Sequence, residues 1–134
     1  MSDEIDWSAL RSVAELARER AYAPYSQYRV GAALLDAEGH IHAGANVENA
    51  SYGLCLCAER SAFGRAISDG VRSFRAIFVL TQGEAPGTPC GMCRQVLAEL
   101  APGIPVRCET VGGARLDTDV AALLPFAFDA EKLT

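Results

Sequence analysis

Cysteines at two places in the chain are spaced as metal ligands are. Cys90 and Cys93 are two residues apart, so both thiolates can reach one ion while the backbone turns between them, and Cys57 can supply a third sulfur. Three sulfurs suit Zn²⁺, and three protein ligands leave one of its four tetrahedral positions open, as in catalytic rather than structural zinc sites. The sequence therefore predicts one catalytic zinc ion per chain, held by Cys57, Cys90 and Cys93.

Glu59 lies two residues after Cys57 and can act beside the ion without binding it. A positioned carboxylate can carry protons to and from a water molecule that zinc activates. Zinc nucleobase deaminases combine a His or Cys, one residue, a Glu and a Pro-Cys-x-x-Cys segment, and three cysteines are allowed. Residues 57–59 and 89–93 follow this pattern, so Glu59 is the predicted catalytic residue.

The alternative is a non-catalytic module that zinc merely stabilises, which would need a fourth ligand. Cys55 or Cys108 could supply it. The Cys55 side chain need not converge with that of Cys57 two residues later, and we expect Cys55 to take no part in zinc binding. Cys108 falls within a predicted strand and is expected to pack as a small apolar residue. Neither candidate gives Glu59 a role.

Hydrophobic periodicity places the cysteines at the starts of helices. Helices are predicted at residues 6–20, 57–69 and 90–100, with a short one at 119–124. Strands are predicted at residues 28–35, 41–46, 76–81 and 105–109, and the nearly continuous apolar run at 76–81 indicates a strand buried on both faces. Interleaved helices and strands predict an α/β fold with a mixed sheet. Helix N-termini favour thiolates over thiols, which suits the proposed ligands.

Composition narrows the function classes. The chain has 134 residues, which suits a single domain over residues 1–134, and a net charge of −5 without a basic run, which disfavours nucleic acid as a partner. Its longest apolar run, residues 120–128, is far shorter than the ~20 residues of a membrane span. The odd count of five cysteines and the acidic N-terminus without an apolar signal core predict a cytoplasmic protein without a disulfide framework.

Further motifs resemble one family, the small cytidine deaminases of nucleoside salvage. The matching stretches cover most of residues 23–128 and lie on both sides of the cysteine motifs. They are Pro24-Tyr25-Ser26, Val30-Gly31-Ala32-Ala33, Asn46-Val47-Glu48-Asn49-Ala50-Ser51-Tyr52, Cys57-Ala58-Glu59-Arg60, Pro89-Cys90-Gly91-Met92-Cys93-Arg94-Gln95-Val96-Leu97, and Leu123-Leu124-Pro125 with Phe128.

The resemblance implies a three-layer α-β-α fold with a five-stranded mixed sheet. It also implies zinc-dependent hydrolysis of cytidine and 2′-deoxycytidine to uridine and 2′-deoxyuridine, with release of ammonia. In the family, residues matching Asn46 and Glu48 hold the sugar 3′-hydroxyl, and backbone groups at Ala58 hold the base. Tyr28 stands where the family usually has a Phe that packs beside the base, so its hydroxyl is an addition that needs a partner when buried.

The resemblance also implies features outside the zinc ligands. Some members with three cysteines use an arginine at the position of Arg60 to hydrogen-bond a ligand sulfur. The working enzyme is expected to be a homotetramer with shared active sites. Phe128 matches an aromatic residue that reaches a neighbouring subunit's site, and Phe126 is the competing candidate.

Two other functions are compatible with these residues. One is deamination of an aminonucleoside antibiotic or of cytosine in a polynucleotide, which uses the same zinc motif. The other is the non-catalytic zinc module, which uses only the cysteines. An enzyme acting on a polynucleotide would need a basic channel to bind the phosphates, and the sequence shows no basic run that could form one. An antibiotic deaminase is not expected to match both the 46–49 segment and Leu123-Leu124-Pro125.

Overall fold

A computed structural model of the chain describes residues 4–133. The helices are α1 (Trp7–Glu19), α2 (Ala58–Ser68), α3 (Gly91–Leu100) and α4 (Val120–Leu123), with short 3-10 helices η1 (Tyr52–Leu54) and η2 (Ala130–Leu133). The strands are β1 (Gly31–Asp36), β2 (Ile41–Ala45), β3 (Phe74–Thr81), β4 (Pro105–Thr110) and β5 (Arg115–Asp119). Within these residues, no helix is long and apolar enough to cross a membrane.

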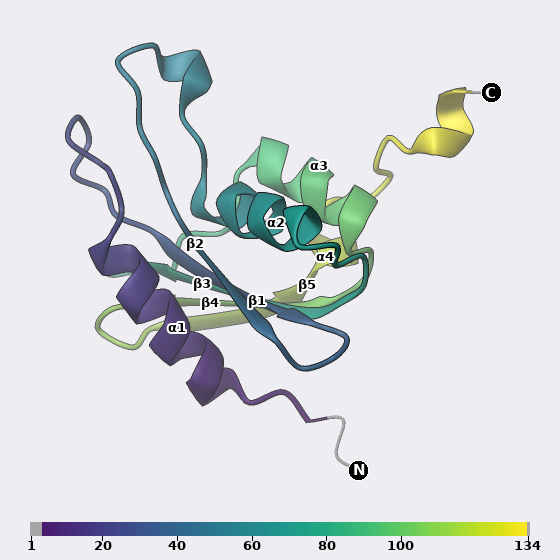
Figure 1. Ribbon diagram of the computed structural model, residues 1–134, viewed down its shortest axis with the longest axis horizontal. Coiled ribbons are helices and arrows are strands. Elements are labelled where there is room, and N and C mark those ends of the chain that lie inside the picture. The colour runs from purple at the N-terminus through teal and green to yellow at the C-terminus, as the bar shows by residue number, and fades with distance from the viewer. Residues whose placement is uncertain (1–3, 134) are drawn as a thin grey trace.

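The strands form one mixed sheet between two layers of helices. Their order is β2-β1-β3-β4-β5; β3 pairs with β4 in parallel, and the other neighbours pair antiparallel. Helix α1 covers one face of the sheet, and α2 and α3 cover the other (Figure 1). The expected three-layer α-β-α fold is therefore confirmed.

Strand β3 is the central strand and is buried on both faces, as its apolar run predicts. Ala76, Phe78 and Leu80 belong to the core under α1. Ile77 and Val79 belong to the core under α2 and α3. Because successive side chains of a strand point to opposite faces, this strand anchors both helix layers.

Sequence periodicity alone predicted four strands and was wrong in leaving out β5. The residues of β5 read Arg-Leu-Asp-Thr-Asp, and all of them except Thr118 are exposed at the edge of the sheet. An exposed edge strand needs no apolar alternation, so the pattern carried no signal. Antiparallel pairing with β4 holds it instead, and it supplies the fifth strand that the resemblance implied.

Helix α2 lies so close to β2 that no side chain fits between them at Gly44. A Cβ on Gly44 would lie 2.2 Å from the carbonyl oxygen of Ala58 and 2.5 Å from the amide nitrogen of Ala62. Both are backbone atoms, which cannot turn aside as a side chain can. Because Ala58 is the first residue of α2, the contact at Gly44 sets how close Cys57 and Glu59 lie to the sheet.

We expect Gly44→Ala to destabilise the protein by about 1–3 kcal/mol, because overpacking against backbone must displace the start of α2. Urea unfolding of the metal-free and zinc-loaded proteins measures this change. Gly64→Ala on the exposed side of α2 is the control, since a Cβ there meets nothing within 4 Å. It should be neutral or stabilising by up to about 1 kcal/mol through helix propensity. Equal effects of the two substitutions would contradict the close-contact explanation.

Candidate active site and metal centre

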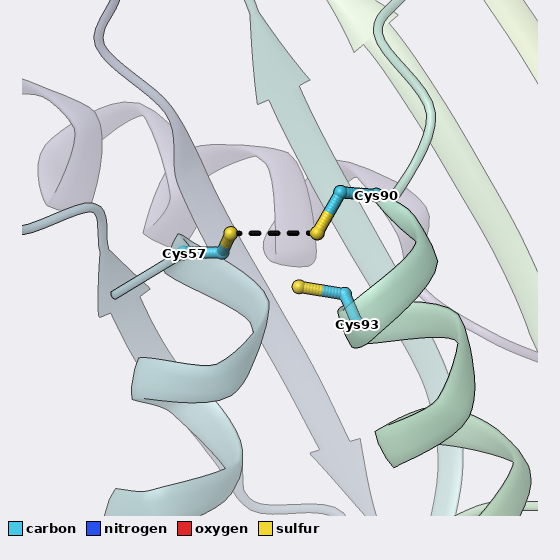
Figure 2. Close-up of side chains that lie close together, drawn as sticks. All are labelled: Cys57, Cys90 and Cys93. Carbon is cyan, nitrogen blue, oxygen red and sulfur yellow. Dashed lines mark hydrogen bonds between the residues drawn. The ribbon is translucent and has the colours of Figure 1, made fainter. Parts of the chain in front are cut away.

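Three thiols converge where α2 and α3 begin. Cys57 and Cys90 are the N-cap residues of α2 and α3, and Cys93 lies in the first turn of α3. Figure 2 shows their sulfurs pointing toward one another from the two helix starts. The Sγ atoms of Cys57 and Cys90 are 3.6 Å apart, and all three sulfurs lie within 4.8 Å of one another. The fold therefore brings the predicted ligands together.

These sulfur separations suit a tetrahedral zinc ion. Zn–S bonds of ~2.3 Å place two ligand sulfurs about 3.8 Å apart. Within residues 4–133, the three cysteines are the one group of metal-ligating side chains that meets at such distances. Cys108 is fully buried in β4, and the Cys55 sulfur lies 3.3 Å from the backbone nitrogen of Asn49. Neither belongs to the cluster, so a zinc ion held by these three cysteines would have one tetrahedral position left open.

Arg60 lies beside this cluster. Its Nη2 is 3.4 Å from the Cys57 sulfur and 3.4 Å from the Cys55 carbonyl oxygen. The Cys93 thiol, followed by the Arg60 guanidinium, lowers the pKa of Cys57 to about 5 against the opposing effect of burial. The hydrogen bond to Cys57 and burial raise the pKa of Cys93. A site that holds a thiolate before any ion is bound suits a cation.

The guanidinium of Arg60 also has an unused donor. Its Nε is buried and has no hydrogen-bond partner among the described residues. Buried polar atoms without partners are rare in folded proteins and call for an explanation. None of the three sulfurs accepts from it, so the fit of the site to a metal ion rests on the convergence and thiol chemistry of the cysteines.

Glu59 is a buried carboxyl in the first turn of α2, with 5% of its surface exposed. Burial raises the pKa of Glu59 to about 7, and the negative charge of Cys57 adds to this effect, while its own backbone amide and Arg60 oppose it. A carboxyl that titrates near neutral pH can both accept and donate a proton in one reaction cycle.

A cavity of about 390 Å³ joins Glu59 to the thiols of Cys57 and Cys90. This volume lies within the usual range of small-molecule sites. A larger cavity of about 510 Å³ is lined by Arg18, residues 21–29 in part, and Gln82, but it contains none of these groups. The chemistry therefore assigns the site to the smaller cavity. Its walls include the predicted substrate residues Tyr28, Asn46, Glu48 and Ala58.

Asn46 is held in place by both ends of its amide. Its Nδ2 donates to the Tyr28 carbonyl at 2.8 Å, and its Oδ1 accepts from the Val30 amide at 2.8 Å. An amide has two donors and two acceptor positions, so half of this capacity remains. Asn46 is thus oriented before any ligand arrives.

Glu48 is held in the same way. Its Oε1 accepts from the backbone amides of Tyr25 and Ser26, at 3.0 and 3.1 Å, and its Oε2 accepts from the Ser26 hydroxyl. The Ser26 hydroxyl, with these amides, lowers the pKa of Glu48. The side chain is therefore an ionised acceptor, and a carboxylate has further lone pairs for a ligand.

Tyr28 and Gly87 fit together at the wall of this cavity. A Cβ on Gly87 would lie 3.0 Å from the Tyr28 hydroxyl oxygen and 3.1 Å from Cγ2 of Thr81. The backbone amide of Gly87 donates to Thr81 Oγ1 at 3.0 Å, which holds the loop in this position. The extra hydroxyl of Tyr28 therefore lies where a side chain at position 87 would otherwise be.

The two candidate aromatics at the C-terminus lie outside the cavity of their own chain. Phe128 is 58% exposed, and Phe126 is fully exposed with a left-handed φ of 55°. The segment that carries them extends away from the body of the molecule (Figure 1). Neither ring belongs to the pocket walls described above.

The order of these groups and their convergence on an open metal position define a zinc-dependent deaminase of nucleobases or nucleosides. Comparison with known families is more specific. The family described as "Cytidine and deoxycytidylate deaminase zinc-binding region" matches residues 5–106. The chain belongs to this family.

Individual proteins of known name are similar to this chain over most of its length. A cytidine deaminase of Sporosarcina psychrophila is 49% identical over 131 residues, which are 97% of this chain and 96% of that protein. The crystal structure of a cytidine deaminase from Burkholderia pseudomallei has a TM-score of 0.90 and 46% identity, and the match covers 92% of this chain and 100% of that one. A blasticidin-S deaminase of Bacillus cereus is more distant, with 28% identity over 124 residues, 85% of this chain and 88% of that protein.

Sequence reasoning missed part of the cavity wall. Leu56, Val79, Thr81 and Gly87 line it although no motif marked them as substrate residues. Thr81 offered one signal, because it is a polar residue at the end of an otherwise apolar run. Gly87 offered no such signal, since its role depends on the Tyr28 hydroxyl that lies opposite it in the fold.

We expect Gly87→Ala to raise KM for cytidine about fivefold, because the added methyl group displaces either the Tyr28 ring or the loop. Combining it with Tyr28→Phe, which removes the opposing hydroxyl, should recover most of the loss. Steady-state kinetics of the single and double variants measure the coupling between the two sites. Independent, additive effects would contradict the paired fit of Tyr28 and Gly87.

Proposed function

We propose that this protein catalyses the hydrolytic deamination of cytidine and 2′-deoxycytidine to uridine and 2′-deoxyuridine, with release of ammonia. The observation that carries the proposal is the position of Glu59, a buried carboxyl with a pKa of about 7 in the same cavity as the thiols. The 49% identity to a named cytidine deaminase supports the choice of substrate.

Glu59 is the proposed acid–base catalyst. Zinc held by Cys57, Cys90 and Cys93 would supply a Lewis acid that lowers the pKa of a water molecule to ~7. Glu59 would accept a proton from the attacking water and deliver it to N3 of the pyrimidine, which makes C4 electrophilic, so that the oxygen of the water can bond to C4. Glu59 then moves the proton of the new C4 hydroxyl to the amino group. The C4–N bond breaks, ammonia leaves, and the C4 carbonyl of uridine forms.

Arg60 is the proposed charge partner of the metal ligands. Three thiolates around a divalent ion leave one negative charge, which would weaken the ion as a Lewis acid. A hydrogen bond from Arg60 to Cys57 withdraws negative charge from that ligand, and the contact is 3.4 Å long.

The remaining cavity residues are proposed to bind the nucleoside. Asn46 and Glu48 would hold the sugar 3′-hydroxyl with the hydrogen-bonding capacity that their internal contacts leave unused. The backbone at Ala58 would hold the base, and the Tyr28 ring would pack beside it. All four residues line the same cavity.

We also propose that the working enzyme is a cytoplasmic homotetramer with one zinc ion per chain and shared active sites. Tyr52 and Leu54 of η1 are 77% and 69% exposed, and Phe128 is 58% exposed. Exposed apolar groups of this size favour an interface, and closed symmetry is the usual way to pair them. Resemblance to the small cytidine deaminases supplies the number four. The net charge of −5 argues against a nucleic-acid partner.

Glu59→Gln is expected to abolish turnover while one zinc ion per chain remains bound, because the amide keeps the shape of the side chain but cannot take the proton. Metal analysis and the ultraviolet change of cytidine on deamination measure the two properties. Cys57→Ala, Cys90→Ala and Cys93→Ala should lose both, whereas Cys55→Ala and Cys108→Ala should keep zinc. Near-normal turnover of the zinc-loaded Glu59→Gln variant would refute the mechanism.

The same assay separates the rival functions. Turnover of blasticidin S in preference to cytidine would favour an antibiotic deaminase, the activity named for the 28% identical relative. Zinc binding without turnover of either nucleoside would favour a non-catalytic module.

Phe128→Ala is expected to raise KM for cytidine with little loss of tetramer, because the ring would cover a base bound by a neighbouring chain. Light scattering should give about four times the chain mass of 14.2 kDa. Phe126→Ala is the matched control, since its ring is the other exposed aromatic of the segment. A larger effect at Phe126 would transfer the role to that residue, and a fully active monomer would contradict the shared site.

A further inference from the structure

Arg94 directly follows the ligand Cys93, yet its guanidinium does not approach the thiols in the manner of Arg60. Its Nε donates to the Pro89 carbonyl at 2.7 Å, its Nη2 to the Thr88 hydroxyl at 2.9 Å, and its Nη1 to the Leu123 carbonyl at 3.0 Å. Arg94 thus joins three segments: the residues just before Cys90, the start of α3, and the end of α4.

Gln95, the next residue, reaches further along the C-terminal segment. Its Nε2 donates to the Phe128 carbonyl at 2.8 Å. Phe128 is otherwise an exposed residue on a segment that extends from the body of the molecule. One side chain of α3 therefore ties down the backbone of the aromatic residue.

We propose that Arg94 and Gln95 are positioning residues that fasten the Cys90 loop and the Phe128 segment to α3, so that the ligand pair and the C-terminal aromatic are held as one unit. Two of the acceptors of Arg94 are backbone carbonyls, so its action depends on the shape of the guanidinium as well as on its charge. The part concerning Phe128 rests on the proposed function, while the part concerning Cys90 does not.

A planar guanidinium suits this task because its donors point in fixed, divergent directions. The Cys90 loop has two of its residues, Thr88 and Pro89, bound to the same group. Partners that orient metal ligands typically change metal affinity ~10–100-fold when they are removed. Loosening this loop should therefore affect zinc retention through Cys90 even though Arg94 is not a ligand.

Arg94→Lys tests the first connection because lysine keeps the charge but cannot occupy all three directions. Zinc-loaded protein is mixed with a chromogenic chelator, and zinc release is followed at a temperature where circular dichroism shows the variant folded. We expect release to be about tenfold faster or more. Arg65→Lys, at an exposed position of α2, is the control and should release zinc at the normal rate.

Thr88→Val is the second variant for this connection, in case the lysine variant does not fold. It removes one acceptor of Arg94 while keeping the size of the side chain, and about a twofold to threefold acceleration is expected. Normal zinc release from both folded variants, or from folded Thr88→Val alone if the other fails to fold, would overturn the role of Arg94.

Gln95→Met tests the second connection, because methionine has a similar length and no donor. Hydrogen exchange of residues 126–133 should become faster, and KM for cytidine should rise about threefold with kcat and zinc content unchanged. Glu99→Gln, one turn further along α3 and exposed, is the control and should change none of these. Unchanged exchange in Gln95→Met would overturn the anchoring role whatever the substrate proves to be.

A double-mutant cycle then shows whether Gln95 acts through the Phe128 ring. If it does, Gln95→Met should add nothing to the KM of Phe128→Ala. Full additivity would overturn that part of the proposal. If exchange is faster in Gln95→Met but Phe128→Ala leaves KM unchanged, the hydrogen bond from Gln95 to the Phe128 backbone is verified. The proposed shared active site is then the part that is wrong.

Discussion

The site depends on two helices that begin at the same place above one sheet. The N-caps of α2 and α3 are both cysteines, and their sulfurs are 3.6 Å apart. The backbone contact between Gly44 and the first turn of α2 fixes one helix start. The loop of residues 82–90 leads from β3 to the other, and Arg94 binds this loop at Thr88 and Pro89. The proposed metal ligation, the proposed acid–base role of Glu59 and the shape of the cavity all depend on this convergence.

The electrostatics of the site are a balance between burial and charge pairing. Burial raises the pKa of Glu59 to about 7 although Arg60, the next residue, opposes it, so desolvation outweighs the guanidinium. At Cys57 the balance is reversed: hydrogen bonds from Cys93 and Arg60 outweigh burial and lower the pKa to about 5. The N-cap of α2 and a residue of its first turn, two positions apart, therefore differ as needed, with an ionised sulfur for a metal and a carboxyl that can exchange a proton.

Helix α3 connects the site to the rest of the chain. Cys93 points to the ligand cluster, Arg94 holds the loop before Cys90 and the end of α4, and Gln95 holds the Phe128 backbone. Three consecutive residues thus face three different structures, because successive positions of a helix are rotated by ~100°. Each residue of the Cys-Arg-Gln segment therefore has its own contact to make.

The sequence by itself determined the chemistry, because ligand type, the Cys-x-x-Cys spacing and the nearby Glu59 are properties of short segments. It also determined the buried strand β3, whose apolar run is a local signal. The sequence also led us to expect Cys55 and Cys108 outside the ligand set, and both lie outside the cluster. Only the tertiary structure decided that Arg94 binds the residues before Cys90 and the end of α4, and that Gly87 lies opposite Tyr28. It also decided β5, which pairing with β4 holds without an apolar pattern. The fit of Gly87 to Tyr28 and the contact of Arg94 with Leu123 join segments far apart in the chain, whereas β5 is a neighbour of β4 whose exposed side chains carry no apolar signal; neither kind of feature can be read from a short motif.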